Sequence, residues 1–148
     1  MIDKLKVVEA AEKANADALT AVTNQQSTLI TKKTTQNVDR KAEEDKSKAV
    51  GAKIGLIETD FGADDPEGIM GHTDGLNTLA TAWLAALNKA DAADAAVTKQ
   101  EGVLKAAQSA QSLTSGKLDD AEPTALPGLQ KKAHEACGEL RKDQSPAK

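Results

Sequence analysis

Residues 74–112 read DGLNTLATAWLAALNKADAADAAVTKQEGVLKAAQSAQS, and this stretch decides the fold of the chain. Ala, Leu, Gln and Lys, which are strong helix formers, dominate it. Apolar and small residues recur at alternating steps of three and four, which predicts one long helix with a heptad seam. We expect Thr73 or Asp74 to cap this helix and Ser115-Gly116 to end it. The predicted seam, which Leu84 and Leu87 widen, consists of Leu76, Leu79, Trp83, Ala86, Ala90, Ala93, Val97, Gln100, Leu104 and Ala107.

A second long helix is predicted over about residues 3–50, where Ala, Leu, Glu and Lys are again frequent. Residues 23–37 are rich in threonine, and are either a polar part of this helix or a break with some strand character. Two seams compete in the first half, and one of them follows Val7 and the alanines at 11, 14, 18 and 21. The other is a heptad with polar interruptions, formed by Leu5, Val8, Glu12, Asn15, Leu19, Val22, Gln26, Leu29 and Lys33.

Residues 59–75, TDFGADDPEGIMGHTDG, separate the two helical patterns. They contain five acidic residues, no basic residue and four of the ten glycines. Because Asp and Gly favour turns, this composition predicts an acidic, glycine-rich loop. After residue 116, Pro123 and Pro127 mark a connector at 117–127, and a short helix is expected at about 128–142.

The predicted architecture is therefore all-α, with no strand required except in the alternative for 23–37. It is a long helical hairpin with coiled-coil-like packing in one elongated domain of 148 residues. The domain would comprise an N-terminal helical arm, an acidic loop, a second long helix, and a connector with a short helix. Their boundaries are 1–58, 59–75, 76–116 and 117–148.

Composition excludes several classes of function. There is no apolar run of about 18 residues, so no transmembrane helix is expected. The N-terminus lacks the apolar core of a secretory signal, which predicts cytoplasmic synthesis. Cys137 is the only cysteine, so neither an internal disulfide nor a cysteine-based metal cluster can form. A pI near 5.2 and only two aromatic residues argue against nucleic-acid binding.

The acidic loop is the best candidate for a metal site, because carboxylate oxygens suit hard cations. Its spacing does not match an EF-hand, however, and Asp65-Pro66-Glu67 also fits a helix N-cap with proline at the first helical position. Asp74 could likewise be only a cap. The candidate ligands are Asp60, Asp64, Asp65, Glu67, His72 and Asp74.

Two other patterns have weaker chemical interpretations. His134 and Cys137 share a helix face, but neighbours at this spacing are poorly placed to build a nucleophilic site, and a lone cysteine is usually a small buried residue. VGAKIGLIE at 50–58 lacks the spacing of a phosphate-binding loop, so it is interpreted as a flexible reversal between helices. We therefore predict no catalytic residue, no metal and no cofactor.

Trp83 has two interpretations. With its leucine neighbours it could anchor a partner protein, since buried tryptophan often dominates interfaces. Alternatively it belongs to the hairpin's main apolar cluster. Asn15 and Gln26 are either solvated or buried polar residues that fix helix register.

The function predicted on these grounds is a non-enzymatic structural or assembly protein. Leu, Ile, Val and Phe number only 27, so large core residues are scarce and long seams call for partners. Those partners would be copies of the chain or other proteins of a larger particle, for example a phage virion. A helical adaptor docking through Trp83 and a cation-responsive protein using residues 60–74 are the alternatives. The residues expected to interact are Leu5, Val8, Leu19, Val22, Leu76, Leu79, Trp83, Leu87, Val97 and Leu104.

Overall fold

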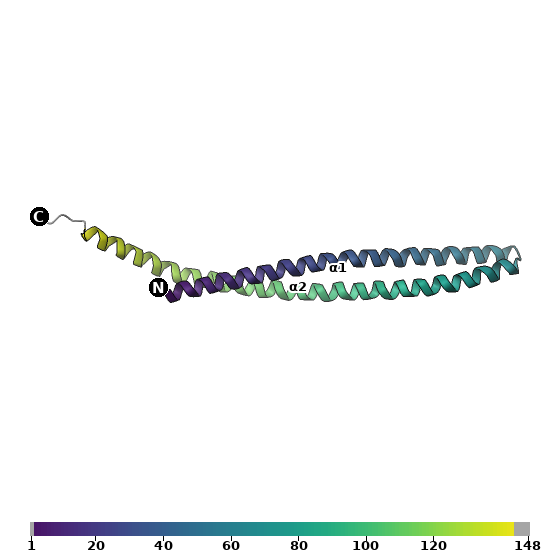
Figure 1. The fold of residues 1–148 in the computed structure, drawn as a ribbon, viewed down its shortest axis with the longest axis horizontal. Helices are drawn as coiled ribbons and strands as arrows, with labels where there is room; N and C mark the ends of the chain where they lie inside the picture. Colours follow the sequence, from purple (N-terminus) through teal and green to yellow (C-terminus); the bar gives the residue numbers. More distant parts are fainter. Residues whose placement is uncertain (1, 144–148) are drawn as a thin grey trace. The chain divides into compact units, whose positions relative to one another are not determined.

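The computed structural model describes the backbone of residues 2–143 and the side chains of residues 2–121 and Glu135. Two helices, α1 (Ile2–Gly62) and α2 (Pro66–Asp143), account for all of the described backbone except residues 63–65. They run antiparallel and pack against each other (Figure 1). The predicted all-α helical hairpin is therefore confirmed.

The chain divides into two compact units, and each contains a piece of both helices. Gln26–Val103 forms one unit, a hairpin that includes the turn, and Met1–Gln25 with Leu104–Lys148 forms the other. The seam of each unit consists of partly covered residues rather than a deep core. Among the described side chains only five are buried: Val22, Asp39, Ala90, Val97 and Gln100.

The turn is much shorter than the predicted loop at 59–75. Only residues 63–65 separate the two helices, because hydrogen bonds in these residues cap the end of α1 and the start of α2. Asp64 adopts the left-handed conformation with φ 57°. Its amide donates to the Phe61 carbonyl at 3.2 Å, and the Asp65 amide donates to the Asp60 carbonyl at 3.0 Å. This is the Schellman pattern that ends a helix. Asp65 then caps α2, since its Oδ1 accepts from the Gly68 amide at 3.1 Å.

With α2 starting at Pro66, the expected cap at Thr73 or Asp74 is wrong, as both residues lie inside the helix. Glycines at 68, 71 and 75 do not prevent this. Each weakens a helix by only about 1 kcal/mol relative to alanine. Gly75 also lies against the side chain of Lys53, whose Cε is 3.2 Å from the position of a Cβ at that glycine.

The possible break at 23–37 does not occur, because α1 is continuous through it. Threonine hydroxyls there donate to backbone carbonyls four residues earlier, as Thr31 does to Ser27 at 3.2 Å and Thr34 does to Ile30 at 3.0 Å. The threonine hydroxyl groups are thereby satisfied within the helix, and the threonine methyl groups are exposed instead.

The predicted end at Ser115-Gly116, the connector at 117–127 and the separate helix at 128–142 are likewise wrong, since α2 continues to Asp143. Ser115, Leu118 and Ala121 remain half-buried, so packing carries the helix beyond Gly116. Pro123 and Pro127 each remove one backbone hydrogen bond. The following Leu, Gln, Lys, Ala and Glu residues have high helix propensity and sustain the helix.

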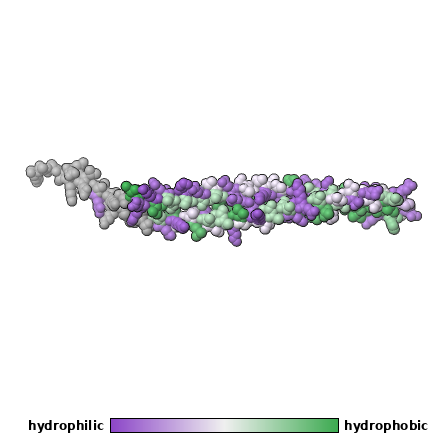
Figure 2. All heavy atoms as spheres, turned by 60° about the horizontal axis from the view of Figure 1, so that its bottom comes forward, coloured by the Kyte–Doolittle hydropathy of each residue, from purple (hydrophilic) through white to green (hydrophobic). Residues whose placement is uncertain are grey.

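Among the described residues, no helix is both long and apolar enough to cross a membrane. Hydrophobic and hydrophilic side chains are intermingled along the visible face (Figure 2).

Candidate interaction surface

The face of α2 that packs on α1 is the predicted one. All ten residues of the predicted heptad, from Leu76 to Ala107, are buried or half-buried. Ala90 is fully buried and Val97 is 5% exposed. Every α2 residue expected to interact therefore lies on this face or at its edge, namely Leu76, Leu79, Trp83, Leu87, Val97 and Leu104.

The seam of α1 combines the two stripes that the sequence offered. Val22 is buried and Val8 is half-buried, as expected, whereas Leu5 and Leu19 are 40% and 55% exposed. Placing Leu5 and Leu19 in the seam is therefore wrong. In their place the seam takes alanines 11 and 18.

Beyond Val22 the same heptad of α1 continues with polar side chains. Its buried or half-buried positions include Gln25, Lys32, Gln36, Asp39, Glu43 and Lys53. The sequence did not reveal these residues as part of the seam, because charged residues usually lie on a solvated face. Their only signal was the seven-residue spacing from Val22 and Leu29 for Gln36 and Glu43, and from Ala11 and Ala18 for the other four.

Asp94 of α2 is the centre of a polar cluster on this seam. It accepts hydrogen bonds from Gln36 Nε2 at 2.9 Å and from Arg40 Nε at 3.1 Å, and Arg40 Nη2 also bonds it. Arg40 Nη2 lies 2.9 Å from Asp91 Oδ1 as well. The hydrogen bond from Arg40, followed by that from Gln36, lowers the pKa of Asp94.

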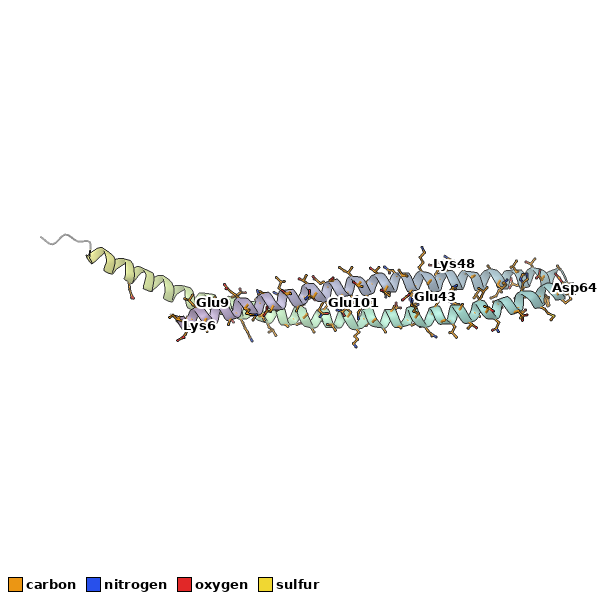
Figure 3. All side chains as sticks on the ribbon, viewed as in Figure 1. Lys6, Glu9, Glu43, Lys48, Asp64 and Glu101 are labelled. Carbon is orange, nitrogen blue, oxygen red and sulfur yellow. The ribbon has the colours of Figure 1, made fainter. Side chains whose placement is uncertain are left out.

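Three more pairs join the helices in this unit. The buried Asp39 carboxylate accepts from Lys89 Nζ at 2.9 Å, and Lys33 Nζ lies 2.9 Å from Glu101 Oε1. Trp83 donates its indole Nε1–H to Glu43 Oε1 at 2.7 Å, so the ring is held in the seam. Glu43 and Glu101 are labelled on α1 and α2 in Figure 3, where Lys48 lies on the outer side of α1.

In the other unit, Asn15 bridges the two helices. Its Oδ1 accepts from Thr114 Oγ1 at 3.3 Å and from Gln111 Nε2 at 3.4 Å. Asn15 is half-buried, which agrees with the buried-amide interpretation of this residue. Gln26, by contrast, is exposed, and its neighbour Gln25 takes the seam position.

The acidic residues near the turn are used in local contacts. His72 Nε2 lies 3.3 Å from Asp60 Oδ2, and Nδ1 of the same ring lies 3.4 Å from Lys53 Nζ. Asp64 and Asp65 form the turn and the cap. Within the described residues, no group of three or more His, Cys, Asp or Glu side chains is arranged to hold a metal ion. The side chains of His134 and Cys137 lie outside the described ones.

No protein-family model, curated protein or solved structure matches this chain.

Proposed function

We propose that the protein is a non-enzymatic structural or assembly component that completes its fold by packing with copies of itself or within a larger particle, for example a phage virion. The shortage of buried apolar side chains carries the proposal. Among the described residues only Val22, Ala90 and Val97 are buried apolar side chains, whereas thirteen large apolar side chains are exposed. Further packing surfaces would bury these exposed side chains.

The composition of the seam supports the same proposal. Alanine occupies four of the ten α2 seam positions, and alanine buries little apolar area. Ion pairs between partly exposed groups add little, typically 0–1 kcal/mol each. A single helical pair therefore gains little from its own contacts. We propose that its coiled-coil-like heptads continue to pack against further helices.

Molar mass by light scattering over a hundredfold concentration range tests the proposal, with helicity by circular dichroism measured on the same samples. We expect a defined oligomer or growth into filaments, and a loss of helicity on dilution as the partners separate. A fully helical monomer at every concentration would overturn self-assembly. It would favour the alternative of an adaptor whose exposed Leu84, beside Trp83, contacts a different protein.

A further inference from the structure

Among the residues whose side chains the structure describes, large apolar side chains are concentrated in 50–87, on both sides of the turn, and none of these is buried. Twelve lie between residues 50 and 87, whereas the buried residues of the Gln26–Val103 unit are Asp39, Ala90, Val97 and Gln100. Two helices alone cover their seam residues only in part. This end of the hairpin therefore leaves partly or fully exposed the side chains whose burial would stabilise it most. They are Val50, Ile54, Leu56, Ile57, Phe61, Ile69, Met70, Leu76, Leu79, Trp83, Leu84 and Leu87.

The ion pairs show which of these side chains share one side of the hairpin. Lys33 bonds Glu101, and one heptad further on Arg40 bonds Asp94. Steps of seven residues keep to the same side of a heptad-packed helix. Ser47, Ile54 and Phe61 of α1 thus follow Arg40, and Leu87, Ala80 and Thr73 of α2 follow Asp94. Met70 and Leu84 come three residues before Thr73 and Leu87. They therefore lie on the same side of α2, but farther from α1. The apolar patch, as we call it, consists of Ile54, Phe61, Met70, Ala80, Leu84 and Leu87.

The patch has projecting and recessed parts. Phe61 is 77% exposed, Met70 72%, Leu84 57% and Ile54 43%. Between them lie small residues at 47, 51 and 80, and no atom lies within 4 Å of the place where Gly51 would carry a Cβ. Large side chains beside shallow positions allow one such surface to pack on another like it.

We propose that a second copy of this chain docks on the apolar patch in an antiparallel arrangement; this inference rests on the proposed function and assigns the surface. The patch spans residues 70–87 of α2, about 27 Å at 1.5 Å per residue, on a helix pair about 20 Å wide. Two copies would bury about 1,100 Å² in total, which exceeds the roughly 1,000 Å² of a specific interface. An area at this lower limit corresponds to a reversible dimer.

Charge determines the orientation of the two copies. Residues 59–75 carry five acidic groups and no basic ones, so a parallel pair would place two such segments together. An antiparallel pair centred near Ile54 instead separates the two acidic turns by about 20 residues of helix, which is about 30 Å. Like charges across an interface disfavour association, so the antiparallel pair is favoured.

Ile54 and Leu56 supply a matched pair for the test. They are 43% and 46% exposed, two residues apart, and therefore on opposite flanks of α1. Near the two-fold axis, Ile54→Glu places two carboxylates together, so we expect the dimer dissociation constant to rise about a hundredfold. Leu56→Glu should change it less than about threefold, since it lies outside the interface. Sedimentation velocity measures both, and Leu84→Glu on α2 should act like Ile54→Glu.

Crosslinking tests the orientation in a Cys137→Ser background. Chains with Ser47→Cys and chains with Phe61→Cys are mixed and oxidised. An antiparallel pair gives crosslinks between the two kinds of chain, whereas predominantly same-residue crosslinks would overturn the orientation. An oligomer that tolerates both Ile54→Glu and Leu84→Glu would overturn the docking surface and leave the proposed function standing. A folded wild-type monomer would overturn both.

Discussion

Replacing Ala90 by leucine tests whether the two helices pack as closely as the structure requires. Ala90 is fully buried on α2, between Lys89 and Asp91, whose side chains bond Asp39 and Arg40 of α1. Leucine adds three carbons at a position with no solvent-exposed space. To make room, the helices must separate and strain these ion pairs. Overpacking of this kind costs about 1–3 kcal/mol of unfolding free energy.

Ala95→Leu is the matched control, since Ala95 is exposed on the same helix and in the same unit. A surface substitution of one good helix former by another should change the unfolding free energy by less than about 0.5 kcal/mol. Urea unfolding at a fixed protomer concentration measures both variants, with the midpoint falling at unchanged slope for Ala90→Leu. Equal stability of the two variants would refute close packing at Ala90.

Three further predictions follow from particular contacts. Gly71→Ala should stabilise the chain by about 0.5–1 kcal/mol, because the new Cβ would meet no atom within 4 Å. Gly68→Ala should stabilise it less, since the new Cβ would lie 2.6 Å from the Asp65 carboxylate that caps α2. Thermal unfolding compares the two variants. Arg40→Met should raise the pKa of Asp94 in a carboxyl NMR titration. Because that pKa is lowered in the folded chain, the Arg40 contact stabilises the wild type above the unfolded pKa of about 3.9. This stability is lost as the pH falls through the folded pKa. The Arg40→Met variant should therefore lose less unfolding free energy than the wild type on acidification. Glu43→Ala should leave the indole N–H of the only tryptophan without its partner and destabilise the unit by about 1 kcal/mol in urea unfolding followed by fluorescence.

The seam of α2 could be predicted residue by residue, but that of α1 could not. In α2 nine of the ten positions are apolar or small, so hydrophobic periodicity alone identifies the face. In α1 the same spacing passes through Lys32, Asp39 and Lys53, which look like surface residues until their partners are known. Asp39 is 5% exposed only because Lys89 of the other helix bonds it. Such pairing depends on how the two helices are aligned, and the sequence of one helix does not show that alignment.

Composition was a poor guide to where helices end. Glycine and aspartate at 59–75 predicted a loop, yet three residues suffice, because Asp64 tolerates a positive φ and Asp65 caps the next helix. The prolines at 123 and 127 predicted a connector that is absent. At the turn, local capping outweighs the turn preference of Asp and Gly. At the prolines, the helix-forming residues that follow sustain α2.

The two seams contribute different things to the pairing. Alanines of α2 allow the backbones to approach but bury little area, and charged side chains of α1 reach over them, as the Lys53 stem does over Gly75. Ion pairs at such positions specify which residues lie opposite one another more than they strengthen the pair. The hairpin therefore has a well-defined register and few buried apolar groups. Its larger side chains, from Ile54 to Leu87, remain available to stabilise it only when another surface covers them. The proposed assembly would account for this distribution, because its partners would cover these side chains.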